Sequence, residues 1–210
     1  MISKRPTTAA RETSTDGAPR PGRKRSPESR AAILAAATAL VREVGYAHLT
    51  IEGIAARARV GKQTIYRWWP SRADVLLEAL ADDADLAISV ADQGTYRADL
   101  QVFLSDTFRL ANAPDVRRIL QTLMAEAQLN PDFGGRFRAA FLARRRDALR
   151  SVVTRAARRG DLPPRPAPDI VLDVVFGVLW YRVLATGESV GDTLATDLLG
   201  MLAPHRGNSS

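Results

Sequence analysis

The chain has 210 residues, 46% hydrophobic and 25% charged, and it contains no cysteine. This composition is typical of a globular protein and excludes disulfides, thiolate nucleophiles and zinc–thiolate sites. No apolar run approaches the about 20 residues of a membrane span, and the first thirty residues lack the apolar block of a secretory signal, so we expect a cytoplasmic protein with no membrane partner.

Positive charge is concentrated at the start of the chain. Residues 1–72 contain 14 lysines and arginines against 5 acidic residues, whereas residues 73–210 contain 16 against 18. This asymmetry points to a polyanion, either nucleic acid or an acidic membrane, as the partner of the first third. A solvated charged surface is the alternative if charge is the only clue.

Residues 1–25 are rich in Pro, Ser, Thr, Gly and basic residues, and we expect them to form a disordered basic arm. Arg23, Lys24 and Arg25 end this arm immediately before the first expected helix. Such an arm can enter a DNA minor groove, or it can simply add positive charge near the duplex.

Ser26 and Pro27 predict the start of the first helix, and Gly45 predicts its end. A second helix is expected from its N-cap Thr50 to residue 58, and a third from Lys62 to about Trp68. Pro70 stops the third helix. Ser71, with Asp74 three residues on, predicts the cap of a fourth.

Every later segment also has helical spacing, and none alternates with the period of two that marks strands. The expected spans are 72–91, 96–112, 115–129, 131–159, 169–187 and 190–203. The predicted fold is therefore all-α, with about nine helices in total. We place an N-terminal three-helix helix-turn-helix DNA-binding domain at residues 26–88 and a helical ligand-binding and dimerisation domain at 89–210.

Two short helices separated by a tight break form a helix-turn-helix pattern, whose second helix is narrow enough for the DNA major groove. The exposed positions of that helix are predicted to be Lys62, Gln63, Thr64 and Arg67. Its buried face is predicted to be Val60, Ile65 and either Trp68 or Trp69.

Residues 30–77 resemble the DNA-binding domain of the TetR family of bacterial transcriptional regulators. The similarity lies in a first helix ending in "GY" (45–46), in "KQTIYR" (62–67), and in two aromatic residues followed by "PS" (70–71). The resemblance implies phosphate contacts for Thr50, Tyr66 and Arg72, and a recognition helix that presents Lys62, Gln63, Thr64 and Arg67 to double-stranded DNA.

Two positions depart from the family pattern. Arg59 occupies a turn position that the family usually fills with glycine, so it is expected either to adopt a strained positive φ or to contact a phosphate. Gln63 replaces a small residue, and glutamine can pair with adenine, so the bases recognised are expected to differ.

The last two helices are expected to form a homodimer. Val171, Val174 and Val178 belong to a set of apolar residues that covers more than one face of helix 169–187, and Leu194 and Leu198 mark a stripe on the final helix. Two such helices and their twofold copies would form a four-helix bundle. The alternative is that these residues form the core of one chain.

The resemblance also implies an effector pocket in the second half. The aromatic and methionine residues expected around it are Phe103, Phe108, Met124, Phe137, Phe141, Phe176 and Trp180. Polar anchors could come from Tyr181, Arg182 or Gln121. The residue pattern by itself favours ordinary core packing for this set.

Catalysis is not expected, because the only histidines, His48 and His205, lie near no nucleophile, metal-binding or phosphate-loop motif. No cofactor and no metal site are predicted. The preferred hypothesis is a dimeric, ligand-responsive repressor that binds a palindromic operator and is released by a small apolar effector. The alternatives are an activator, or a less specific architectural DNA-binding protein without an effector.

Overall fold

The computed structural model describes residues 26–204. The expected arm residues Arg23, Lys24 and Arg25 lie outside this range, as does His205. The described residues form helices and loops and contain no strand, which confirms the all-α prediction.

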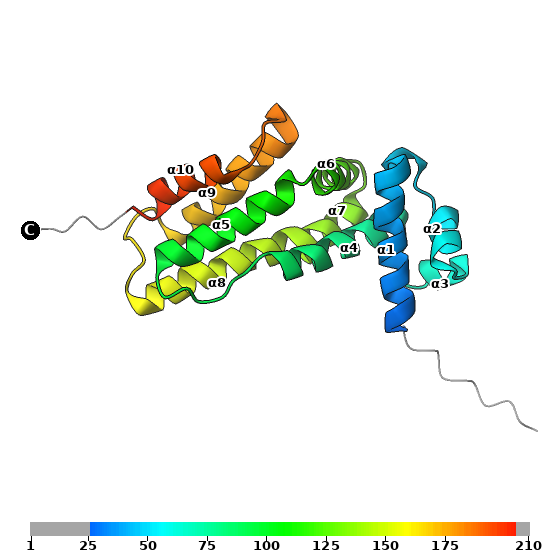
Figure 1. Cartoon of the computed structure of the whole chain (residues 1–210), viewed down its shortest axis with the longest axis horizontal. Helices are drawn as coiled ribbons and strands as arrows, with labels where there is room; N and C mark the ends of the chain where they lie inside the picture. The colour runs from blue at the N-terminus through cyan, green and yellow to red at the C-terminus, as the bar shows by residue number, and fades with distance from the viewer. Residues whose placement is uncertain (1–25, 205–210) are drawn as a thin grey trace, which may run out of the picture.

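Four helices form the N-terminal part, and three of them lie at one end of the elongated molecule (Figure 1). They are α1 (Pro27–Val44), α2 (Ile51–Ala58), α3 (Lys62–Tyr66) and α4 (Arg72–Ala87), with a single 3-10 turn (Tyr46–His48) between α1 and α2. The third and fourth helices end earlier than predicted. At the end of α4, Ile88 adopts an extended conformation and the Ser89 N–H donates to the Asp106 carboxylate, so the chain leaves the helix there.

The rest of the chain forms α5 (Tyr96–Asn112), α6 (Pro114–Leu129), α7 (Pro131–Phe137), α8 (Arg144–Arg159), α9 (Pro168–Trp180) and α10 (Asp192–Leu202). A π-helical segment, Arg138–Ala143, joins α7 to α8 without a break, so residues 131–159 are one continuous helix, as predicted. A second π-helical segment, Tyr181–Thr186, extends α9.

Local side-chain capping explains where several helices begin. The hydroxyl of Thr50 accepts a hydrogen bond from the Gly53 N–H at 3.0 Å, which satisfies a backbone donor that the first turn of α2 leaves free. Ser26 and Ser71 cap α1 and α4 in the same way. Gly45 ends α1 with φ 76° and ψ 167°, a combination that side chains exclude.

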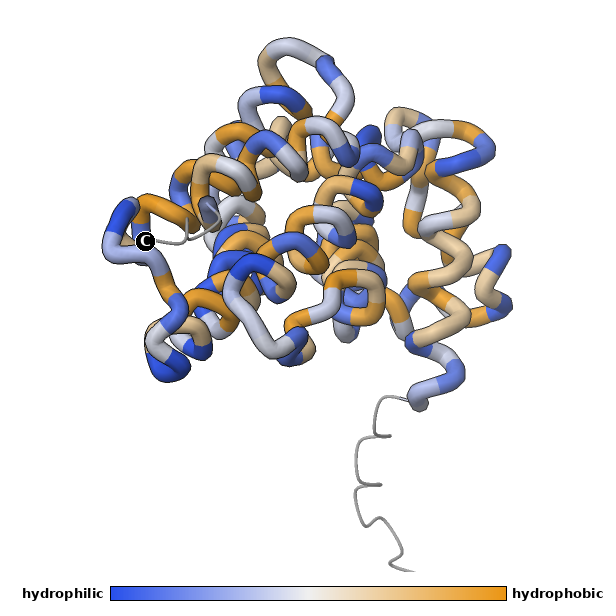
Figure 2. Tube along the Cα trace, turned by 60° about the vertical axis from the view of Figure 1, so that its left-hand side comes forward, coloured by the Kyte–Doolittle hydropathy of each residue, from blue (hydrophilic) through white to orange (hydrophobic). Residues whose placement is uncertain are grey.

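The apolar core runs through the whole described chain, and α4 connects its two ends. This helix packs against α1 on one side and against α5, α6 and the first π-helical segment on the other. Hydrophobic and hydrophilic stretches alternate along most of the helices (Figure 2), as expected of helices with one buried face. A movement of α4 would therefore shift the helices packed against it at both ends of the molecule.

Candidate DNA-binding surface and effector cavity

The inner face of α3 is fixed by a buried tryptophan. Ile65 is fully buried, Trp69 is 2% exposed and Trp68 is 38% exposed, so Trp69 supplies the floor beneath α3. The indole N–H of Trp69 donates to the Glu78 carboxylate on α4 at 2.8 Å. The other oxygen of Glu78 pairs with Arg30 on α1 at 2.5 Å. One carboxylate on α4 therefore holds both α1 and Trp69, which follows α3 in the chain.

The outer face of α3 is polar and open to solvent. Lys62, Gln63 and Arg67 are exposed, Thr64 is half-buried, and Tyr66 exposes about half of its surface. Lys62 forms an ion pair with Glu52 of α2 at 3.1 Å. Because a backbone N–H and Lys62 both stabilise the ionised form, the pKa of Glu52 lies below its usual value. Every predicted recognition position therefore reaches the surface at least in part.

Two of the predicted phosphate contacts have structural roles. Thr50 caps α2, and its hydroxyl proton remains able to donate. Arg72 donates to the Leu49 carbonyl, and its guanidinium lies 4.4 Å from the centre of the Tyr46 ring. In the free protein the Arg72 side chain ties the start of α4 to the α1–α2 connection, and its phosphate contact stays a prediction.

Arg59 ends α2 in the left-handed conformation, with φ 55° and ψ 43°. It is the one non-glycine residue with positive φ among the residues described. Its exposed side chain lies in the turn between α2 and α3, beside the predicted recognition surface.

Two ion pairs connect this end of the molecule to the remaining helices, and the Glu126 carboxylate of α6 lies near Tyr46. Buried Asp74 of α4 accepts two hydrogen bonds from Arg136 of α7, at 2.6 and 3.1 Å. Arg42 of α1 pairs with Asp115 of α6 at 3.0 Å. Burial and the nearby Glu126 carboxylate of α6 raise the pKa of Tyr46. The N-terminal helices are thus attached to α6 and α7 as well as to each other.

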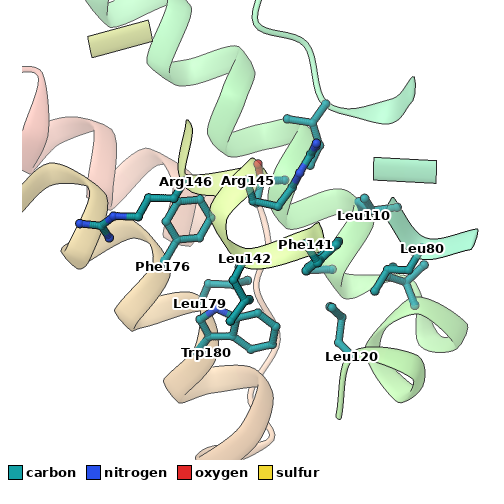
Figure 3. A pocket seen from close by; sticks show the side chains of 14 residues that line it. Leu80, Leu110, Leu120, Phe141, Leu142, Arg145, Arg146, Phe176, Leu179 and Trp180 are labelled. Carbon is teal, nitrogen blue, oxygen red and sulfur yellow. The ribbon is translucent and has the colours of Figure 1, made fainter. Parts of the chain in front are cut away.

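A mainly apolar cavity of about 220 Å³ lies between α4, α5, α6, α8 and α9 (Figure 3). Its walls consist of Leu80, Ile88, Thr107, Leu110, Ala111, Val116, Leu120, Phe141, Leu142, Arg145, Arg146, Phe176, Leu179 and Trp180. In Figure 3 the side chains of Leu142, Leu179 and Trp180 lie together, and the Arg146 guanidinium extends away from them.

Only part of the predicted pocket lines this cavity. Phe141, Phe176 and Trp180 do so. The other predicted residues do not line it: Phe103, Phe108 and Phe137 are buried in the core, and Met124 packs against the core.

The predicted polar anchors are also wrong for this cavity. Gln121 donates to the Val183 carbonyl at 2.8 Å, Arg182 donates to the Ser189 carbonyl, and Tyr181 is exposed. Sequence reasoning missed Thr107 and Arg145. Both lie on otherwise amphipathic helices, where nothing local distinguishes a cavity-facing polar residue from a solvated one.

The last two helices differ from the prediction in the faces they expose. Val171, Leu194 and Leu198 are buried within the chain and belong to its core. Val174 and Val178 are half-buried. The exposed apolar face of α9 and its π-helical extension follows helical spacing and contains Ile170, Val174, Gly177, Val178, Tyr181 and Leu184.

Within residues 26–204, no group of three or more His, Cys, Asp or Glu side chains is placed to hold a metal ion. No helix in that range is long and apolar enough to cross a membrane.

A short exposed helix, set on an apolar floor after a tight turn, defines a helix-turn-helix protein of the DNA-binding class. Family models agree: residues 33–79 match "Bacterial regulatory proteins, tetR family", and residues 90–202 match "Tetracyclin repressor-like, C-terminal domain". The chain belongs to the TetR family of DNA-binding transcriptional regulators.

Individual relatives cover most of the chain. The HTH-type transcriptional regulator YdeS of Bacillus subtilis is 29% identical over 178 residues, which are 85% of this chain and 89% of YdeS. The crystal structure of the TetR family regulator SCO0332 has a TM-score of 0.74 at 29% identity and covers 84% of this chain and 98% of that one. FadR of Bacillus subtilis, solved with stearoyl-CoA, shares the fold, with a TM-score of 0.65 at 19% identity and coverage of 82% and 97%.

Proposed function

We propose that this protein is a homodimeric repressor that binds a palindromic operator and releases it when a small, largely apolar effector fills the cavity. The observation that carries the DNA-binding part is the exposed polar face of α3 above the buried Ile65 and Trp69. A helix held in this way can enter a major groove without losing its packing on α2.

Some residues of the recognition surface would contact bases and others would contact phosphates. Gln63 can make two hydrogen bonds to adenine, and Arg67 can contact guanine or phosphate. Tyr66 ends α3, Arg59 lies in the turn before it and Thr50 caps α2, and all three suit contacts with the backbone of the duplex. Lys62 would exchange its exposed partner Glu52 for a phosphate at small cost, because ion pairs at the surface contribute little.

Dimerisation would use the exposed apolar face of α9 rather than the buried residues first expected. Ile170 and Tyr181 lie on this face and are 48% and 63% exposed in the single chain. A twofold contact between two such faces is self-complementary and would set the spacing of the two α3 helices. A single α3 of five residues offers few base contacts, so a second half-site is needed for tight binding.

The cavity is placed to influence DNA binding. Leu80 of α4 and Phe141 of the first π-helical segment both line it, and this segment follows directly from α7, which carries Arg136. Since Arg136 holds Asp74 at the start of α4, a ligand that shifts either helix would move the α3 end of the molecule. We propose residues 26–88 as the DNA-binding part and 89–210 as the regulatory part.

The direct test is to select fragments of the parent genome that the full chain binds, and then to measure affinity for the enriched sequence and for random DNA at fixed salt. Enrichment of a palindrome with a specific affinity at least about 10³ times the non-specific one supports the proposal. A ratio near one would make the protein an architectural DNA-binding protein instead. If the palindrome is bound but its neighbouring genes fall in expression when the protein is deleted, the protein is an activator.

A further inference from the structure

Two polar atoms of the cavity walls have no hydrogen-bond partner. Among the described residues, the hydroxyl of Thr107 and the Nε of Arg145 are both buried and unpaired. Thr107 is only 6% exposed, and the Arg145 side chain is 11% exposed. They belong to the neighbouring helices α5 and α8 and line the same cavity. Because leaving a buried donor unpaired is costly, a pair of them in one apolar cavity indicates a ligand that carries an acceptor.

The charges around Arg145 indicate that the acceptor is an anion. Asp85 accepts hydrogen bonds from both Arg144 and Arg145, so two guanidinium groups share one carboxylate. Arg146, the other arginine of the cavity wall, already pairs with Asp173 at 2.8 Å. Three arginines therefore face two carboxylates here, so one positive charge is left without a counter-charge from Asp85 or Asp173. Burial also lowers the pKa of Arg145, which means that its charged form lacks solvation that an anion could replace.

We propose that the effector is an amphipathic monocarboxylate whose carboxylate accepts hydrogen bonds from Arg145 Nε and Thr107 Oγ1, while its hydrocarbon part fills the apolar end of the cavity. Charge-assisted hydrogen bonds of this kind are stronger than those to a neutral oxygen. The inference deepens the proposed function, because it names the chemical class of the ligand for the same cavity.

The size of the cavity limits the hydrocarbon part. A cavity of about 150 Å³ accommodates a benzene ring. The 220 Å³ found here therefore suits a molecule of about ten non-hydrogen atoms, such as a medium-chain or aromatic acid. A coenzyme A thioester would have to leave its nucleotide outside, and its acyl oxygen is neutral, so Arg145 would gain no counter-charge from that group.

Calorimetric titration of the full chain with octanoate, 1-octanol and octanoyl-coenzyme A tests this inference. Octanoate should bind at least about tenfold more tightly than the other two probes. Thr107→Val, which has nearly the same shape, should reduce octanoate affinity about tenfold and reduce 1-octanol affinity by less, because a hydrogen bond to a neutral oxygen is weaker. The same change should not lower Tm, because it removes a hydroxyl that has no partner in the free protein.

Matched variants separate the cavity from the surface charge. Arg145→Met should remove the preference for octanoate over 1-octanol. Arg144→Met removes the other guanidinium bound to Asp85 but does not line the cavity. Asp85 then neutralises Arg145 alone, so octanoate affinity should fall, but by less than with Arg145→Met, and the preference for octanoate over 1-octanol should remain. Thr122→Val on α6 is the matching threonine control, since the Thr122 hydroxyl donates to the Arg118 carbonyl and does not line the cavity. If Arg145→Met does not fold, the Thr107→Val result decides the matter.

If octanoate and 1-octanol bind equally well, the proposal that the effector carries a carboxylate is refuted. Octanoate binding that does not change in Thr107→Val would refute it as well. Tighter binding of octanoyl-coenzyme A would overturn the free acid as the ligand class. Operator binding measured without any of these probes tests the proposed function separately. A protein that binds its palindrome but ignores octanoate would refute this inference alone.

Discussion

Replacing Arg59 by glycine should stabilise the protein and at the same time weaken its binding to DNA. Arg59 has φ 55° and ψ 43°, a conformation that costs a residue with a side chain about 1–2 kcal/mol. Glycine relieves this strain but loses about 0.5–1 kcal/mol through the greater freedom of the unfolded chain. The net gain should be about 0.5–1 kcal/mol, or about 2 °C in Tm for a chain of this size.

The effect on DNA comes from the lost charge. If each Arg59 contacts one phosphate, its removal should reduce the slope of log affinity against log salt by about 0.9 per site, hence about 1.8 for a dimer. Thermal unfolding and fluorescence anisotropy at several salt concentrations measure the two effects. Arg59→Lys should change neither quantity, and Arg59→Ala should reduce only the salt slope. A glycine variant less stable than the parent would refute the strain argument, and an unchanged slope would refute the phosphate contact.

Four further changes test other parts of the account. Gln63→Ala should alter which base is preferred in a selection experiment; equal weakening on all sequences would mean that the recognition surface is misplaced. Trp69→Phe should lower the free energy of unfolding in urea by about 2 kcal/mol, because Glu78 loses a hydrogen bond from the indole; no loss would mean that this bond does not hold the α3 segment. Asp99→Asn should cost about 3 kcal/mol at pH 7. Burial opposes the ionised form of Asp99, but the Gln93 N–H and two arginines outweigh it and hold its pKa below its usual value, so the parent's advantage should persist at neutral pH and disappear as the pH falls below about 4. Tyr181→Arg should convert the dimer to a monomer in sedimentation experiments, whereas Leu86→Arg, at a side chain that is 89% exposed on α4, should not; dissociation by both or by neither would exclude the α9 face as the interface.

Features set by local chemistry were predictable from the sequence. Ser26, Thr50 and Ser71 cap the helices that they were expected to cap, because a capping hydroxyl needs only a backbone N–H two or three residues on. The positive φ of Arg59 was expected from the resemblance to the TetR family, which usually has glycine at this turn position. The continuous helix 131–159 was also predictable, since no proline interrupts it after Pro131, although Gly134 and Gly135 disfavour it locally.

Features that depend on which helices meet were not predictable. Helix α9 is apolar on more than one side, so the pattern could not show that Val171 faces the core and Ile170 faces solvent. For α10, the leucine stripe was correctly identified, but Leu194 and Leu198 pack against their own chain. A leucine stripe predicts that one face of a helix is buried, but it does not show whether the same chain or a second copy covers that face.

The cavity and the π-helical segments are further cases. Phe137 and Phe141 are one turn apart on the same helix, yet Phe137 is buried in the core and Phe141 lines the cavity. The π-helical segment begins at Arg138, just after Phe137, and contains Phe141, so it changes the register of the side chains from that point on. No residue type marks such a segment in a single sequence.

The central claim is that two copies of α3 occupy major grooves on one face of the DNA. Methylation interference on the selected operator tests it directly, because methylation of guanine N7 blocks contacts in the major groove. We expect interference in two clusters whose centres are about one helical turn, or a whole number of turns, apart. A single cluster, clusters on opposite faces of the duplex, or interference only at minor-groove positions would contradict the account.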